Sequence, residues 1–80
     1  MSELTLVTRA GCPLCEEMAA SVGGLIAHTA HRLVSRDVDA DPALKSTFGW
    51  DVPLLFAGEI EICRHELNLA AFRQWLRAHP

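Results

Sequence analysis

The sequence predicts a small mixed α/β domain in which a four-stranded sheet is flanked by helices, in the order β-α-β-α-β-β-α. Two patterns predict this class. Some segments alternate polar and apolar residues, as strands do, and others repeat apolar residues every three or four positions, as helices do. The chain has 80 residues, half of them apolar, with charges spread along its length. Such a length holds one hydrophobic core, so we expect a single domain over residues 1–80.

The chain is expected to begin with a strand and a helix. Residues 3–8, ELTLVT, alternate polar and apolar side chains and predict a strand. A helix is predicted from Pro13, a residue that suits the first helical position, to about Thr29. Gly23 and Gly24 lie inside this helix, and we attribute them to close packing of the helix against the sheet.

A second strand and a short helix should follow. Residues 32–39, RLVSRDVD, predict the strand. The next helix has Asp41 as its N-cap, Pro42 at its first position and Gly49 at its end. Because a helix connects the first two strands, they are expected to be parallel neighbours.

The last part of the chain predicts a hairpin and a closing helix. Residues 52–58, VPLLFAG, form an apolar run with a proline near its start, where a strand tolerates one. Gly58 turns the chain into 59–63, EIEIC, and the two strands make an antiparallel hairpin. Residues 65–78 then carry apolar side chains at helical spacing.

Charge and hydropathy exclude several classes of function. The net charge is −3 and the seven basic residues form no cluster, which argues against nucleic-acid binding. The first residues, MSELTLV, lack the basic region of a signal peptide. No apolar run approaches the roughly 20 residues that span a bilayer. We therefore expect a cytoplasmic protein without nucleic-acid or membrane partners.

The segment RAGCPLCEEM places two cysteines where the first strand gives way to the first helix. Cys12 is expected at the helix N-cap and Cys15 one turn in. The free N–H groups and the dipole at this end stabilise a thiolate on Cys12, and Cys15 is placed to resolve a mixed disulfide. Arg9 is expected to lower the pKa of the Cys12 thiol, whereas Glu16 and Glu17 would raise it if they turned toward the sulfur.

A metal site is the main alternative for this cysteine pair. Zinc takes about four ligands, and Cys63 and His65 are candidates to complete a site with Cys12 and Cys15. We favour the redox interpretation because the pair opens a helix with Cys-Pro. Alternation along the last strand places Cys63 on the face opposite Ile60, and we interpret it as a spare thiol. The alternative is a third redox cysteine that exchanges with Cys12.

The order of motifs resembles the glutaredoxins of the thioredoxin-like superfamily over essentially the whole chain. The shared features are CPLC after a strand, VP at 52–53 before the third strand, a hairpin and a closing helix. The resemblance implies a thioredoxin-like fold in which Cys12 attacks and Cys15 resolves. It also implies a cis Val52–Pro53 bond beside the dithiol, with the Val52 backbone exposed to pair with an extended thiol substrate.

Several positions depart from the glutaredoxin pattern, and they predict a divergent member. Leu14 replaces the usual Tyr, Asp51 replaces a Thr, and Cys63-Arg64 replaces a Gly-Gly pair. The acidic residue that contacts the amino group of glutathione corresponds to Glu66. The lost glycines remove a close backbone approach to a bound tripeptide, so glutathione is expected as a co-substrate at most and no cofactor is expected to be tightly bound.

The residues before the closing helix have two interpretations of equal weight. Arg64 either lies solvated in a loop or grips a substrate carboxylate. His65 or Glu66 would, in the first interpretation, cap the helix. Elsewhere, Trp50 is interpreted as a packing residue rather than as part of the substrate groove, and His31 as a partner of the first helix's dipole.

Together these patterns predict a small thiol–disulfide oxidoreductase that acts as a monomer. Its partners would be a disulfide-bearing protein or small thiol, and glutathione or an external reductase would reopen the Cys12–Cys15 bond. The alternative is a binding module that holds zinc or an iron–sulfur cluster, or a redox-inactive adaptor. The residues expected to contact substrate are Arg9, Leu14, Val52, Pro53, Arg64 and Glu66.

Overall fold

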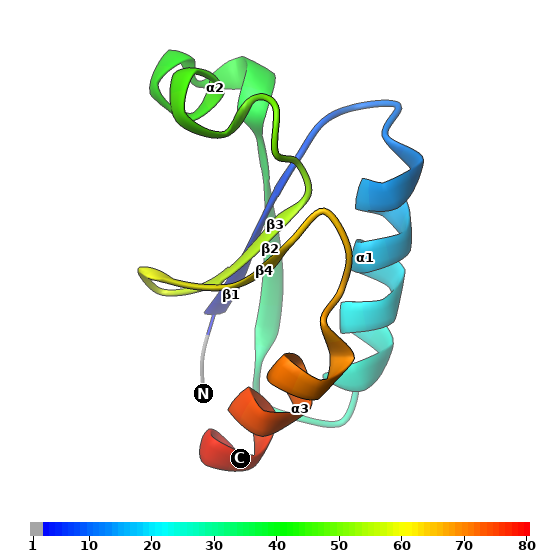
Figure 1. Ribbon diagram of the computed structural model, residues 1–80. Coiled ribbons are helices and arrows are strands. Elements are labelled where there is room, and N and C mark those ends of the chain that lie inside the picture. Colours follow the sequence, from blue (N-terminus) through cyan, green and yellow to red (C-terminus); the bar gives the residue numbers. More distant parts are fainter. Residues whose placement is uncertain (1–2) are drawn as a thin grey trace.

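The computed structural model describes residues 3–80 and has the predicted element order (Figure 1). The first two residues of the expected domain lie outside the described part. The elements are β1 (Glu3–Thr8), α1 (Pro13–Leu25), β2 (Arg32–Asp37), the 3₁₀ turn η1 (Val38–Ala40), α2 (Pro42–Phe48), β3 (Leu54–Ala57), β4 (Ile60–Arg64) and α3 (Leu69–Ala78).

The strands form one mixed sheet in the order β2-β1-β3-β4. Strand β1 is parallel to β2 and antiparallel to β3, and β3 and β4 form the antiparallel hairpin. Gly58 lies in the hairpin turn with a φ of 62°, a conformation that glycine adopts without strain. The predicted fold class is therefore confirmed.

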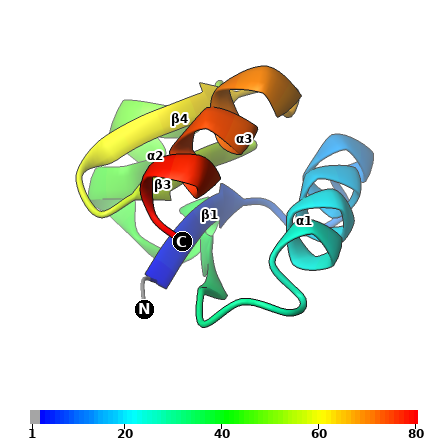
Figure 2. The same ribbon diagram turned by 90° about the horizontal axis from the view of Figure 1, so that it is seen from below.

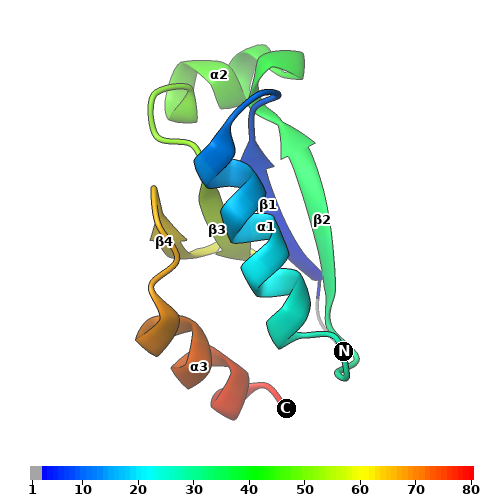
Figure 3. The same cartoon turned by 90° about the vertical axis from the view of Figure 1, so that its right-hand side faces the viewer.

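The sheet separates two apolar clusters. Helices α1 and α3 cover one face, and α2 packs on the other (Figures 2 and 3). Alternation along β1 sends Leu4 and Leu6 to the first face and Val7 to the second. The larger cluster comprises Leu4, Leu6, Met18, Val22, Ile26, Leu55, Cys63 and Phe72. The smaller one comprises Val7, Val38 and Leu54.

Helix α1 is shorter than predicted, because the chain tightens into a turn at Ile26, whose carbonyl accepts the N–H of Thr29 at 3.0 Å. The hydroxyl of Thr29 donates to the Ile26 carbonyl at 2.8 Å and so takes over an acceptor at the end of the helix. The helix stops at Leu25 and not near residue 29. The packing role predicted for Gly23 and Gly24 is wrong, since a Cβ built on either would meet no atom within 4 Å.

The predicted role of His31 at the dipole of α1 is wrong, because His31 lies beyond the end of that helix. Its side chain is only 6% exposed. The ring lies 4.9 Å from that of Trp75 between centroids, and Nε2 is hydrogen-bonded to the carbonyl of His79. His31 thus joins the start of β2 to the end of α3.

Carboxylates that bind nearby backbone set two other boundaries, of which one differs from the prediction and one agrees with it. Strand β2 ends at Asp37, whose side chain accepts the N–H of Asp39 at 2.9 Å and turns the chain into η1. Asp41 caps α2 as predicted, by accepting the N–H of Ala43 at 2.9 Å. Gly49 is the C-cap of that helix, as predicted, and a Cβ there would lie 2.5 Å from the Lys45 carbonyl oxygen, so the position favours glycine.

Helix α3 begins later than predicted. Its N-cap is Asn68, whose side-chain oxygen accepts the N–H of Ala71 at 3.1 Å. The interpretation of His65 or Glu66 as the cap is therefore wrong. The four residues before Leu69 belong to the loop between β4 and α3.

A β-bulge in β4 reverses the predicted orientation of Cys63. Leu55 pairs with Cys63 and Phe56 with Glu61, so Ile62 is an extra residue in the ladder. An extra residue shifts the alternation of side chains by one position. Cys63 therefore faces the main core and is 8% exposed, whereas simple alternation placed it on the opposite face from Ile60.

Arg9 ties the β1–α1 loop to α2. Its Nε and Nη2 donate to the two carboxylate oxygens of Asp39 at 2.8 and 2.9 Å, and Nη1 donates to the carbonyl of Gly49 at 2.9 Å. The guanidinium lowers the pKa of the Asp39 carboxyl, mainly through the hydrogen bonds. We call the contact of Arg9 with Asp39 and Gly49 the Arg9 tether.

Phe72 should be the main anchor of α3, because it is fully buried in the larger cluster. Phe72→Ala is expected to lower the free energy of unfolding by about 3–5 kcal/mol, measured by urea denaturation. Leu69→Ala, at an exposed position of the same helix, serves as the control. A loss below about 1 kcal/mol for Phe72→Ala would contradict this assignment.

The Arg9 tether should make stability depend on pH in acid. The pKa of Asp39 is lowered from 3.8 in the folded state, so its ionised form stabilises the fold above pH 3.8. That contribution is lost as the pH falls through the lower folded-state pKa. Asp39→Asn should consequently lose less stability between about pH 5 and about pH 2 than the wild type. Glu59→Gln, in the hairpin turn, is the control and should follow the wild type.

Candidate active site

The first turn of α1 holds the two cysteines in different surroundings. Cys12 is the N-cap, and its Sγ accepts the backbone N–H of Cys15 at 3.2 Å. The two Cα atoms are 5.2 Å apart and the sulfurs lie at disulfide-bonding distance. Cys12 is partly exposed, whereas Cys15 is 2% exposed. An incoming disulfide therefore meets Cys12 first.

This position also favours the thiolate form of Cys12. The N–H groups of the first helical turn have no partner within the helix, and the dipole adds positive potential there. Pro13 at the first helical position starts the turn without a donor of its own. Arg9 was expected to act on the Cys12 thiol. Its guanidinium instead donates to Asp39 and Gly49 in the Arg9 tether.

The loop before β3 lies beside the N-terminus of α1 (Figures 1 and 3). It contains a cis Val52–Pro53 peptide bond. Pro53 is buried, and its carbonyl accepts the N–H of His65 at 2.7 Å. His65 has a φ of 69°, in the left-handed region, at the point where the chain leaves β4. The loops before β3 and after β4 are thus fixed to each other.

A charge network joins the same two loops. Arg64 donates to both carboxylate oxygens of Glu61, at 2.8 and 2.6 Å, and lies 3.4 Å from a carboxylate oxygen of Asp51. The other carboxylate oxygen of Asp51 is hydrogen-bonded to Nε2 of His65 at 3.1 Å. These hydrogen bonds from Arg64 hold the pKa of the Glu61 carboxyl below its usual value. A substrate carboxylate at Arg64 would compete with two carboxylates of the chain itself.

A groove of about 530 Å³ lies between α1 and the loop after β4. The structure brings two predicted substrate contacts, Leu14 and Glu66, to this groove, together with Glu17 and His65. Leu14 is 47% exposed. Arg9 is instead found on the side of α2, away from this lining.

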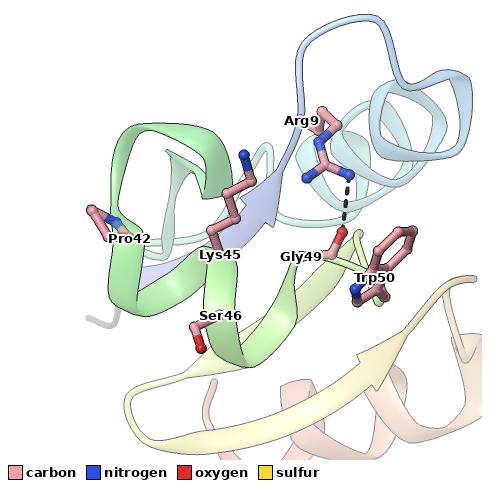
Figure 4. A pocket seen from close by; sticks show the side chains of 6 residues that line it. All are labelled: Arg9, Pro42, Lys45, Ser46, Gly49 and Trp50. Atoms are coloured by element: carbon pink, nitrogen blue, oxygen red, sulfur yellow. Dashed lines mark hydrogen bonds between the residues drawn. The ribbon is translucent and has the colours of Figure 1, made fainter.

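Trp50 is the residue that the sequence interpretation missed. Its side chain is 97% exposed, so the predicted packing role is wrong. The backbone turns sharply there, since the N–H of Asp51 donates to the Phe48 carbonyl at 2.9 Å. Trp50 lines a pocket of about 470 Å³ together with Arg9, Pro42, Lys45, Ser46 and Gly49 (Figure 4). The sequence feature that could have indicated its exposure is its position directly after Gly49, the glycine that ends α2.

Cys63 is separated from the solvent by its place in the core. Burial raises the pKa of the Cys63 thiol, which favours the protonated form. Within residues 3–80, no three His, Cys, Asp or Glu side chains are arranged to hold a metal ion. The zinc set of Cys12, Cys15, Cys63 and His65 is therefore not assembled. No helix in the same range is long and apolar enough to cross a bilayer.

Known structures share this fold. The chain is similar to protein Ne2328 from Nitrosomonas europaea, with 30% identity over 92% of this chain and 89% of that one and a TM-score of 0.82. It is also similar to protein XcR50 from X. campestris, with 32% identity over 96% and 99% of the two chains and a TM-score of 0.69. Thioredoxin 1 from Thermosipho africanus TCF52B is 16% identical over 95% and 96%, with a TM-score of 0.63, and shows likeness of fold alone.

A search of curated proteins found no match. The model of one protein family, described as Glutaredoxin-like domain (DUF836), matches residues 3–77, which is nearly the whole chain. That match agrees with the mixed sheet and with the cysteine pair at the start of α1. The chain belongs to the glutaredoxin-like domain family and has a thioredoxin-like fold.

Proposed function

We propose that the protein is a thiol–disulfide oxidoreductase in which Cys12 attacks and Cys15 resolves. The Cys12 thiolate forms a bond to one sulfur of a substrate disulfide, and the other substrate sulfur leaves as a thiolate that takes up a proton. The Cys15 thiolate then attacks Cys12 Sγ and releases the second substrate thiolate. The substrate gains two electrons and the protein is left with a Cys12–Cys15 disulfide.

The observation that carries this proposal is the asymmetry of the pair. Cys12 is the partly exposed N-cap and accepts a backbone N–H, whereas Cys15 is buried one turn away. An exposed sulfur with a stabilised thiolate suits the attacking role. Cys15 suits the resolving role, because its sulfur is buried and its Cα lies 5.2 Å from that of Cys12, within the range of a disulfide.

The loop with the cis Val52–Pro53 bond is a candidate binding site for the substrate. It lies beside the N-terminus of α1, and Val52 is only partly buried. We propose that an extended segment of the substrate runs along the Val52 backbone with its cysteine toward Cys12. An external reductant, either glutathione or a dithiol reductase, then returns two electrons. We propose a cytoplasmic setting, where such reductants keep dithiols reduced.

The rival function is a binding module that holds zinc or an iron–sulfur cluster, or an adaptor without redox activity. The arrangement of donors speaks against a zinc site built from this chain's residues 3–80 alone. A redox-inactive adaptor would not need one sulfur exposed and the other buried. The following experiment separates these functions.

An equilibrium redox titration tests the proposal. Free thiols are counted by alkylation and mass spectrometry over a range of glutathione ratios, and a reversible two-electron midpoint between roughly −180 and −270 mV is expected. Cys12→Ser should react with no substrate disulfide, and Cys15→Ser should accumulate the mixed disulfide on Cys12. A pair that never closes, or stoichiometric metal in the purified protein, would sink the proposal in favour of the binding module.

Cys63 should stay outside this chemistry. In the reduced protein, iodoacetamide should modify Cys12 much faster than Cys63, and urea should remove the difference. Burial raises the pKa of Cys63 above 9.0, so its protonated form stabilises the fold below pH 9.0, and this contribution is lost as the pH rises through the folded-state pKa. Cys63→Ala should therefore have a flatter decline of stability in alkali. Rapid alkylation of Cys63 in the folded protein would instead support a third redox cysteine.

A further inference from the structure

The exposure of Trp50 is a feature that the oxidoreductase chemistry alone does not require. An indole can bury 150–250 Å² and is enriched at binding sites, yet here the side chain is 97% exposed. The chain's other tryptophan, Trp75, packs on Phe72 and His31. Trp50 follows α2 directly and precedes the Asp51-Val52-Pro53 segment of the proposed substrate site.

The backbone that carries Trp50 is held on both sides. Before it, the Gly49 carbonyl accepts from Arg9 and the Gly49 N–H donates to the Lys45 carbonyl, each at 2.9 Å. After it, the Asp51 N–H donates to Phe48, and its side chain contacts His65. The indole is therefore presented from an ordered turn, so little backbone entropy is lost when a ligand covers it.

The pocket beside Trp50 is basic. Its lining includes Arg9 and Lys45 and no acidic residue, and Figure 4 shows these two side chains and Trp50 arranged around Gly49. Asp39 contacts both cations, but Lys45 Nζ lies 3.7 Å from it and that side chain is 61% exposed. Lys45 thus has donors left for a carboxylate from another molecule.

The opposite groove has the reverse charge. Between α1 and the loop after β4 it is lined by Glu17 and Glu66. A substrate segment with an acidic residue is repelled on that side and attracted on the side of α2.

We propose that Trp50 and Lys45 bind the polypeptide next to the target cysteine, with an apolar or aromatic side chain on the indole and a carboxylate on the ammonium. This inference rests on the proposed function and names its substrate class. The substrate is a protein disulfide with an acidic and aromatic flank, and glutathione is at most the reductant.

The test compares two peptide disulfides that differ only in carrying Glu-Phe or Lys-Phe flanks, with 2-hydroxyethyl disulfide as a reference that has no flank. The wild type should prefer the Glu-Phe peptide. In Trp50→Ala, kcat/KM for the Glu-Phe peptide, divided by kcat/KM for 2-hydroxyethyl disulfide, should be about tenfold lower than in the wild type. Lys45→Glu should reverse the preference between the peptides. The matched controls are Ile60→Ala, an exposed apolar residue of the hairpin, and Arg73→Gln, an exposed cation of α3.

Ratios within twofold of the wild type for Trp50→Ala, or a Lys-Phe preference in the wild type, would overturn the inference. A binding measurement separates it from the proposed function. The reduced Glu-Phe peptide is titrated into the Cys12→Ser protein with and without Trp50→Ala, and heat of binding is recorded. If no disulfide is turned over but Trp50-dependent binding is retained, the oxidoreductase falls and the docking surface stands. If neither turnover nor binding is observed, both fall.

Discussion

The hydrogen bond from the Cys15 N–H to Cys12 Sγ joins the fold of this protein to its chemistry. A helix must satisfy the N–H groups of its first turn, and here a sulfur takes the place that Ser, Thr, Asp or Asn usually fills. The sulfur is consequently fixed at the positive end of α1. The helix is itself held by Met18, Val22 and Ile26 in the core. Packing of the helix against the core thus fixes where the Cys12 sulfur lies.

The two loops around this turn are held by ion pairs in place of the glycines usual in glutaredoxins. Asp51 and Arg64 are both departures from the glutaredoxin pattern, and the structure places them 3.4 Å apart. Asp51 is hydrogen-bonded to His65 as well, and Arg64 to Glu61, so the opposite charges of these two positions are offset within the chain. The two departures therefore compensate each other.

The sequence was sufficient for the order of elements because each depends on local patterns. Alternation in β1 and Pro13 after Cys12 are visible over a few residues. The orientation of Cys63 was not predictable, because it depends on one extra residue in the pairing of β4 with β3. The partners of Arg64 depend on the same pairing. The role of Arg9 was also hidden, since Asp39 lies 30 residues away in the sequence.

Trp50 shows how far such local reasoning extends. An aromatic residue beside a helix end is usually buried, so packing was the reasonable interpretation. The Arg9 tether and the hydrogen bond of Asp51 instead turn the backbone so that the indole faces the solvent. The charges of Arg9, Asp51 and Arg64 are paired within the chain and screened by salt, so they discriminate weakly between ligands. Selection among disulfides then falls mainly to the exposed indole and to Lys45, the cation beside it with the weakest partner.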